Sequence, residues 1–569
     1  MSGRTRSRAT IAAITFVAFA ATAVYALPLD RFFVMPDELV YAKTSLAIWH
    51  SPPLVGPGSD WFVSWSELAP LGYSLPLGAL GDPVDGLRLA HGIAAATMAL
   101  TAIPVYVLAR DVTGDRRAGY MAAALSVSVP WMAMSASLMT EVFAYPAMAW
   151  AACAAVRACA QPSPGRDAHA VIAAAVAVLA RAQLAFVPIA LILAVVVCSR
   201  RQRRDLREHR LLLAVCLLVL TALTVRVSLG GGLASVLGDY ASLNHQRGFS
   251  LAIGGRLIAY IGVAIGAVPL ILGLPWIAAS LRRRAPTQLG FGVFACVSLT
   301  AVVFQASLEL SQPGRLQDRY LIYALPLVFI AMTAALLEEP RRVGMVAVVG
   351  LAFAVLVSRY DFFEAGAELT SLSFAFHEPI KTAAFNSGLD PGLFVGSLIV
   401  ALTGLLTLWL RTATSRLTIV GLCVLTFCIA ETAYTLRQMH QTSYVYGYVE
   451  PRPRDWVDRL VPPGSQVALL VTQAGNPLRT PISWWDVGFW NKSVERLYIP
   501  PWRGAQRWGQ PATRVLDLDA QGHPRDERVW WVVSVADPRV RVVGGRAIAR
   551  AGVLELRQAS RESPLRLIR

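Results

Sequence analysis

The sequence is poor in charged residues and in cysteine. Only 15% of its 569 residues are charged, whereas 55% are hydrophobic. At a mean hydropathy of +0.51, the apolar runs are too numerous to be buried in a soluble core. The seven cysteines lie in or beside apolar runs, and none lies beyond residue 428. This distribution predicts neither a disulfide framework nor a cysteine-type metal site.

Acidic residues are also scarce. The chain has 36 Asp and Glu against 52 Lys and Arg, which gives a net charge of +16. Such an excess would suggest a nucleic-acid partner in a soluble protein. Here much of the arginine lies in short loops between apolar runs, which is the positive-inside pattern of membrane proteins. The sequence therefore predicts a lipid bilayer and no nucleic acid as its environment.

What the chain has in abundance is apolar runs of membrane-spanning length. Helices of about 17 to 25 such residues cross the hydrocarbon core of a bilayer. The runs predict a polytopic α-helical membrane protein with about thirteen spans. We place them at 10–29, 88–109, 118–136, 140–158, 167–181, 183–199, 211–228, 254–280, 288–307, 319–337, 343–358, 392–410 and 417–435.

Five basic loops agree on one orientation. If the N-terminus is cytoplasmic, the loops at 115–117, 200–207, 281–284, 338–342 and 411–416 all face the cytoplasm. The N-terminal apolar run is too long for a typical signal-peptide core, so we interpret it as a retained first span. The Ala- and Arg-rich composition suggests a GC-rich bacterium, and the predicted location is its plasma (inner) membrane.

The sequence predicts two domains that differ in character. Residues 1–435 form the transmembrane domain, with a first outer loop at 30–87. Residues 436–569 form a small extracytoplasmic α/β domain, with a helix near 454–461 and β-like runs such as 528–535. This C-terminal region also carries Asn-Lys-Ser at 491–493, which matches the N-glycosylation sequon.

The first outer loop opens with adjacent carboxylates in FFVMPDELVY, residues 32–41. An apolar stripe follows with the spacing of a helix that lies on the membrane surface, formed by Leu39, Ala42, Leu46 and Trp49. Asp37 stands at the start of this helix. Its simplest role is an N-cap, because an Asp there accepts free backbone N–H groups. The alternative is chemistry at the depth of the lipid headgroups.

Further ionisable residues gather on the predicted outer face. Glu141 starts the fourth span and Arg181 lies in the turn between two others, while a later span begins with Arg315, Asp318, Arg319 and Tyr320. Charges at membrane depth are costly, so they tend to pair or to line a polar cavity. Each arginine could instead snorkel to the interface, and Glu141 could form a structural salt bridge with one of them.

These motifs resemble a known superfamily. PDELVY, TEVFAYP at 140–146, ARAQ at 180–183 and DRYLIYALPL at 318–327 are similar to motifs of the GT-C polyprenyl-phosphate-sugar-dependent glycosyltransferases. The most similar pattern is the branch of the protein O-mannosyltransferases and lipid A aminoarabinose transferases. The resemblance covers roughly residues 10–340.

The resemblance implies roles for individual residues. In that superfamily an acidic residue of the first outer loop serves as catalytic base or orients the acceptor, and by position it corresponds to Asp37, with Glu38 second. Basic residues that hold the donor phosphate correspond to Arg181, Arg319 or Arg315. The further candidates for the site are Glu141, Asp318, Tyr320 and Tyr41. The implied reaction moves a sugar from a polyprenyl-phosphate donor to a glycan, lipid or protein acceptor, with inversion at the sugar.

No cofactor is predicted with certainty, but the carboxylates could hold a divalent cation, because hard cations prefer oxygen ligands. The metal requirement stays unknown. Two other functions fit parts of the pattern. A transporter or flippase for a lipid-linked sugar would need the same arginines without a base. A non-enzymatic membrane scaffold would bind glycan through its Trp-rich C-terminal region.

Overall fold

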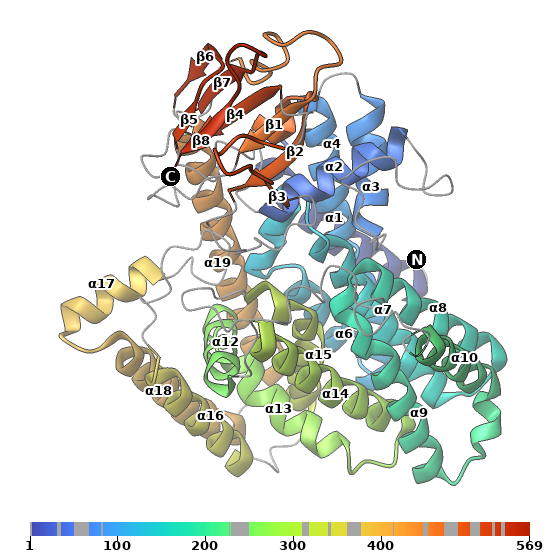
Figure 1. Ribbon diagram of the computed structural model, residues 1–569. Coiled ribbons are helices and arrows are strands. Elements are labelled where there is room, and N and C mark those ends of the chain that lie inside the picture. Colours follow the sequence, from blue (N-terminus) through green and yellow to red (C-terminus); the bar gives the residue numbers. More distant parts are fainter. Residues whose placement is uncertain are drawn as a thin grey trace.

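The computed structural model has a helical membrane part and a small sheet region (Figure 1). It describes residues 3–30, 36–50, 68–80, 83–226, 228, 250–309, 318–338, 343–360, 377–412, 415–447, 453–470, 487–500, 513–525, 530–535, 541–552 and 554–568. Within these ranges, eight helices are long and apolar enough to cross a membrane, or nine if one bent pair counts as a single span. The predicted fold class is confirmed; the count of thirteen spans stays a prediction.

Each of the thirteen predicted ranges contains helix. The helices are α1 (Gly3–Ala26), α2 (Pro36–His50), α3 (Leu68–Ala79), α4 (Pro83–Ala99), α5 (Ala102–Thr113), α6 (Arg116–Ser126), α7 (Glu141–Ala160), α8 (Pro164–Ala180), α9 (Val187–Gln202), α10 (Arg210–Arg226), α12 (Leu251–Ala264), α13 (Val268–Ser280), α14 (Pro286–Glu309), α15 (Leu325–Leu337), α16 (Val343–Ser358), α17 (His377–Ser387), α18 (Pro391–Thr412) and α19 (Arg416–Gly447). Helix α19 continues past residue 435, where we placed the domain boundary, and the division into two domains stays a prediction.

Helices α7 and α15 form the centre of the bundle. The apolar spans Glu141–Ala160 (α7) and Arg319–Leu337 (which includes α15) are each 83% buried inside the protein, against 33% for the span within α18 and 28% for the span within α19. Helix α7 is rich in alanine, and small side chains let neighbouring helices approach closely. Helices α16 and α18 pack against each other at one edge of the bundle (Figure 1).

The predicted span 254–280 is not one straight helix. It consists of α12 and α13, which meet at an angle of 117°. Gly266 and Ala267 have positive φ angles of 79° and 63°, and Pro269 follows at the start of α13. A left-handed backbone cannot continue an α-helix, and proline is favoured in the first turn of the next one. These residues account for the break.

Three short 3₁₀ segments precede or interrupt helices at one end of the bundle. They are η2 (Pro130–Ala136), η3 (Ala182–Phe186) and η7 (Asp318–Ala324). Each lies where we predicted continuous apolar helix or its end. Such segments leave backbone groups and side chains at helix ends in irregular orientations, and they are common at functional sites.

The sheet has six strands in the order β3-β2-β1-β4-β7-β6. Strands β1 (Val467–Leu470), β2 (Val494–Ile499), β3 (Thr513–Val515) and β4 (Trp531–Val535) are parallel, while β7 (Leu554–Gln558) and β6 (Arg546–Ala551) add antiparallel pairs. Strands β5 (Arg541–Val543) and β8 (Arg566–Ile568) form a separate pair. The expected helix at 454–461 is instead a series of turns.

Asn491 is a buried hub of this region. Its Oδ1 accepts hydrogen bonds from the backbone N of Val457 (2.9 Å) and Asp458 (3.1 Å). Its Nδ2 donates to the carbonyls of Arg454 and Val487, each at 3.0 Å. The residue is 0% exposed, so the sequon that contains it is closed to modification in the folded protein.

Candidate functional site

The site is built on residues 138–141, which run from the connection after η2 to the first residue of α7. This segment contains Leu138, Met139, Thr140 and Glu141, all of which are buried. Four elements that are distant in sequence contact it: α2, α3, the turn before η3, and η7. The acidic and basic residues that sequence analysis placed on one face therefore meet around one short piece of backbone.

Glu141 lies between two arginines. Its Oε2 forms an ion pair with Nη1 of Arg181, and its Oε1 lies 3.4 Å from Nε of Arg319. The carboxylate side chain is 0% exposed and each arginine side chain only 5%. The contact with Arg319 is longer than a well-formed N–H···O hydrogen bond, so Arg181 is the closer partner. Two cations thus share one buried carboxylate.

Arg181 is held at a fixed break in the chain. It caps the C-terminus of α8 in an extended conformation, with φ −160° and ψ 127°, and η3 begins directly after it. Its Nε donates to Oε1 of Gln183 (2.6 Å), and its Nη1 donates to Oγ1 of Thr140 (2.6 Å). The ARAQ motif therefore supplies both the guanidinium and one of its positioning partners.

Tyr320 links the two arginines. Its ring centroid lies 5.3 Å from Cζ of Arg181 and 5.5 Å from Cζ of Arg319, which are cation–π distances. Nη1 of Arg319 also contacts Sδ of Met139 at 3.9 Å. Nearby, the hydroxyl of buried Tyr323 has no hydrogen-bond partner among the described residues. The Tyr320 ring orients both guanidinium groups without neutralising their charge.

The first outer loop reaches the same segment. The backbone N of Leu138 donates to Oε2 of Glu38 (3.1 Å), and the Tyr73 hydroxyl donates to the Met139 carbonyl (3.3 Å). Burial, and then the charges of Glu38 and Glu141, hold the pKa of Tyr73 well above its usual value. Tyr73 is therefore a neutral hydrogen-bond donor at physiological pH.

Helix α2 differs from the expected membrane-surface helix. Its stripe residues Leu39 and Ala42 are buried, but so are Lys43, Thr44 and Ser45 on its other sides. Nζ of Lys43 donates to the carbonyls of Asn491 and Val494, each at 3.3 Å. The sheet region thus covers the polar face of α2, a long-range contact that helical spacing does not encode.

The remaining candidates are placed only in part. Asp37 is the second residue of α2 and Asp318 the first of η7, but their side chains lie outside the described residues, as does all of Arg315. Tyr41 is half-buried in α2. Thr140, Gln183 and Tyr73 were not predicted as site residues, although Thr140 lies in TEVFAYP and Gln183 in ARAQ.

No cluster of three or more His, Cys, Asp or Glu side chains suited to a metal ion occurs among the described residues. Because the Asp37 and Asp318 side chains are not among them, the divalent cation stays a hypothesis. In the described part of the site, two guanidinium groups contact Glu141, and guanidinium groups are well suited to bind phosphate oxygens.

The chain is similar in sequence and in fold to known proteins. A sequence family described as dolichyl-phosphate-mannose-protein mannosyltransferase matches residues 80–227, a range that contains Glu141 and Arg181 but neither Asp37 nor Arg319. A comparison with curated protein sequences gave no match.

Among solved structures, ArnT from Cupriavidus metallidurans in the apo state matches with a TM-score of 0.56 and 17% identity over 98% of both chains. ArnT bound to undecaprenyl phosphate matches with a TM-score of 0.55 and 16% identity, over 95% of this chain and 97% of that one. The oligosaccharyltransferase AglB from Archaeoglobus fulgidus matches with a TM-score of 0.43 and 13% identity, over 92% and 69%. The resemblance predicted from the motifs is confirmed: the chain has the ArnT-like membrane fold of the GT-C glycosyltransferases.

Proposed function

We propose that the protein is a membrane glycosyltransferase that moves a sugar from a polyprenyl-phosphate donor to an acceptor outside the cytoplasm. The observation that carries the proposal is the buried pair of arginines around Glu141 at the ends of membrane helices. The fold supports it, because ArnT shares this fold and has been solved with undecaprenyl phosphate bound. A donor of this kind keeps its tail in the bilayer and presents its phosphate at headgroup depth.

Arg319 is the proposed ligand of the donor phosphate. The ion pair of Arg319 with Glu141, at 3.4 Å, is longer than that of Arg181. Replacing the Glu141 contact of Arg319 by a contact with a phosphate oxygen therefore costs less than breaking the Glu141 contact of Arg181. Arg181, with Gln183, Thr140 and Glu141 around it, acts as the positioning cation. The planar fork of arginine can hold two phosphate oxygens and stabilise the charge that develops as polyprenyl phosphate departs.

Asp37 is the proposed general base. Glu38, its neighbour, accepts a hydrogen bond from Leu138, which ties the first turn of α2 to the segment that ends at Glu141. In an inverting displacement, Asp37 accepts the proton of an acceptor hydroxyl as that oxygen attacks the anomeric carbon. The bond from this carbon to the phosphate oxygen breaks on the opposite side. The reaction therefore needs a carboxylate base and a phosphate-binding arginine at the same depth in the membrane.

The test is Asp37→Asn in the full-length protein. Asn caps a helix about as well as Asp but cannot act as a base, so the variant should fold normally and lose transfer. Turnover is measured with undecaprenyl-phosphate-linked mannose, arabinose and 4-amino-arabinose, and donor-site binding with undecaprenyl phosphate. Glu38→Gln serves as the control for removing a carboxylate at the neighbouring position, because Glu38 accepts a hydrogen bond from the backbone N of Leu138. An Asp37→Asn protein with parental turnover on any of these donors would defeat the assignment.

The alternative function, a transporter or flippase for the lipid-linked sugar, is favoured by one observation. Helices α12 and α13 form a broken span, and broken helices often form substrate sites in transporters. The described residues contain one such pair, without the repeat-related partner that transporters of this type have. This alternative would be favoured if the parent protein transfers no sugar and the Asp37→Asn variant translocates the lipid-linked donor at the parental rate.

A further inference from the structure

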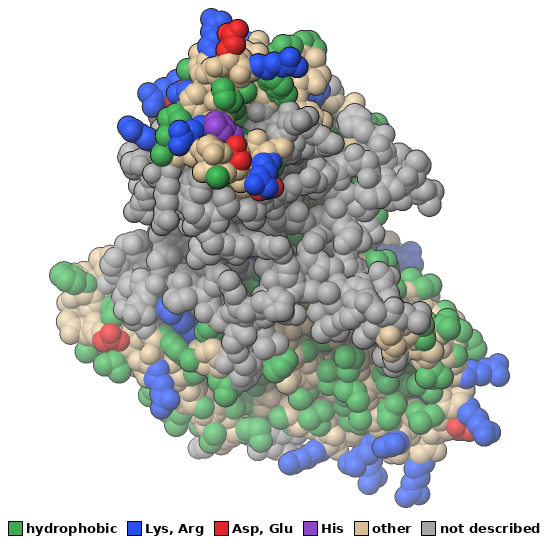
Figure 2. All heavy atoms as spheres, in the orientation of Figure 1, with side chains coloured by type: hydrophobic (Ala, Val, Ile, Leu, Met, Phe, Trp, Pro, Cys, Tyr) green, Lys and Arg blue, Asp and Glu red, His purple; other side chains and the backbone are tan. Residues whose placement is uncertain are grey.

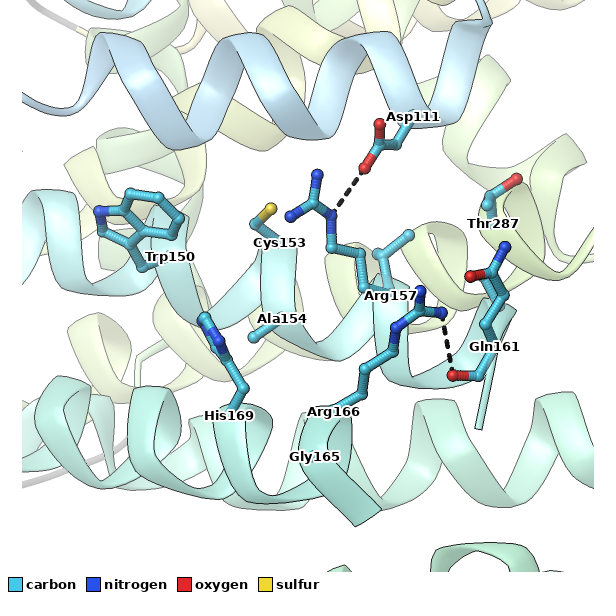
Figure 3. Close-up of a pocket in the computed structure, with 12 residues that line it drawn as sticks. Asp111, Trp150, Cys153, Ala154, Arg157, Gln161, Gly165, Arg166, His169 and Thr287 are labelled. Carbon is cyan, nitrogen blue, oxygen red and sulfur yellow. Dashed lines mark hydrogen bonds and ion pairs between the residues drawn. The ribbon is translucent and has the colours of Figure 1, made fainter. Parts of the chain in front are cut away.

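A cavity of about 600 Å³ lies at the end of the bundle opposite the candidate site. It is formed where α5 and α7 end and where α8 and α14 begin (Figure 3). Arg157, on its wall, lies sixteen residues after Glu141 on α7. At a rise of 1.5 Å per residue, about 24 Å of helix separates the two sites. The cavity is therefore distinct from the proposed donor site.

The cavity has a cationic mouth. Nε of Arg157 donates to Oδ2 of Asp111 (2.8 Å), and Nη2 of Arg110 donates to Oδ1 of the same carboxylate (2.9 Å). Nη1 of Arg166 donates to the Gln161 carbonyl (3.0 Å). Two arginines thus share the Asp111 carboxylate, and Arg166 adds a third positive charge to the region, which leaves an excess of positive charge. Figure 3 shows Arg157 and Arg166 from two different helices, both bordering the cavity.

Part of the cavity wall beside Arg157 is apolar. Trp150, Cys153, Ala154 and Val156 line it from α7. Trp150 is 37% exposed, so an aromatic surface remains available at the cavity.

An apolar track continues from the cavity along α8. His169 lines the cavity, and Ile172, Val176 and Leu179 follow it at spacings of three, four and three residues. These three apolar side chains are 62%, 39% and 45% exposed. In a membrane protein such an exposed stripe faces lipid.

The cavity also lies at the basic face of the molecule. Lys and Arg side chains gather along the edge opposite the sheet (Figure 2). By the distribution of basic loops, this face is the cytoplasmic one, where the inner leaflet presents anionic lipids. Basic pockets between membrane helices on this side are suited to anionic headgroups.

We propose that this cavity binds an anionic phospholipid of the cytoplasmic leaflet. Arg157 and Arg166 would hold the phosphodiester, Trp150 would pack against the glycerol and upper acyl carbons, and an acyl chain would lie along α8. The apolar wall favours a lipid over free phosphate, because a small anion would leave the tryptophan and the α8 track unused. This proposal is independent of the glycosyltransferase reaction.

The test is native mass spectrometry of the purified full-length protein in detergent. The probes are dioleoyl-phosphatidylglycerol, dioleoyl-phosphatidylcholine and soluble glycerol phosphate. We expect phosphatidylglycerol to bind more tightly than phosphatidylcholine. Each of Arg157→Gln and Arg166→Gln should weaken it about fivefold, the order of effect of one basic residue on anionic-lipid binding. The matched control is Arg200→Gln with Arg201→Gln, an exposed pair in the last turn of α9.

Arg157→Gln also removes a partner of Asp111, so its thermal stability is measured alongside binding. Arg166→Gln leaves the Asp111 contacts intact and tests the site even if the first variant is unstable. Selective loss of phosphatidylglycerol binding in Arg166→Gln, with the control unchanged, supports the site. Equal binding of the two lipids, an equal loss in the control, or glycerol phosphate binding as tightly as the lipid would overturn it.

Discussion

Replacing Glu141 by Gln tests the charge arrangement of the candidate site directly. The substitution keeps the size of the side chain and removes its charge. The carboxylate is fully buried between Arg181 and Arg319, each with a side chain only 5% exposed. The variant would leave two buried guanidinium groups on either side of a neutral amide, with no described carboxylate between them.

The expected cost is large. Removing one partner of a buried ion pair typically destabilises a protein by about 3–5 kcal/mol, because the other charge stays buried and uncompensated. Glu141 also stands in the first turn of α7, where a negative charge interacts favourably with the helix dipole. We therefore expect the free energy of unfolding, measured by SDS titration in mixed micelles, to fall by about 3–5 kcal/mol.

The matched control is Asp455→Asn. Asp455 pairs with Arg459 at 2.8 Å, but the two side chains are 47% and 62% exposed. Solvent screening limits such pairs to about 0–1 kcal/mol. A loss for Glu141→Gln as small as that of the control would refute the reasoning that the two arginines depend on this carboxylate.

A second measurement separates stability from function. If the arginines bind phosphate, undecaprenyl phosphate should supply the missing negative charge and stabilise Glu141→Gln more than the parent protein. The stabilisation grows with ligand concentration over Kd, so a titration of melting temperature reports it. Equal stabilisation of the two proteins would contradict the phosphate assignment even if the loss of stability is as expected.

Four further predictions concern the two arginines, the membrane topology and the sheet region. Arg319→Lys should lower turnover by roughly 10²-fold or more with little loss of stability, as when a donor to a developing anion is removed. Arg181→Lys should instead lower thermal stability, because Lys cannot keep the contacts with both Thr140 and Gln183; equal turnover of both variants and the parent would refute the division of roles. The C-terminus should lie outside the cytoplasm, so a reporter that works only there should be active when fused after Arg569, and one that works only in the cytoplasm should be inactive. Asn491→Asp should destabilise the sheet region by about 1–3 kcal/mol in hydrogen exchange, because the buried carbonyls that Asn491 binds lose their donor.

Much of the helical fold could be predicted because hydrocarbon thickness sets the length of an apolar run. The interruptions could not. The break at Gly266 and Ala267 depends on two positive φ angles, and alanine rarely adopts one. Hydropathy does not predict the 3₁₀ segments before Glu141 and after Arg181 either, because their residues are as apolar as those of the helices beside them.

The charged part of the site was predictable for a different reason. Ionisable groups within apolar runs are few and expensive to bury, so Glu141, Arg181 and Arg319 stood out, and the structure brings them together. Their neutral partners did not stand out. Tyr73 resembles any interface tyrosine in sequence, and only the folded chain shows its hydroxyl on the Met139 carbonyl.

The sheet region covers α2 and so contacts the helix that carries Asp37 and Glu38. Lys43 donates to the carbonyl of the buried Asn491 itself and to that of Val494, the first residue of strand β2. Near the start of α2, a side chain at Gly488 would place its Cβ 3.0 Å from Cδ2 of Leu39, so glycine permits close packing there. Glu38 ties the same turn to the segment that carries Glu141. The helix that presents the proposed base is therefore held from two sides, and its position relative to the arginines depends on the sheet region as well as on the membrane bundle.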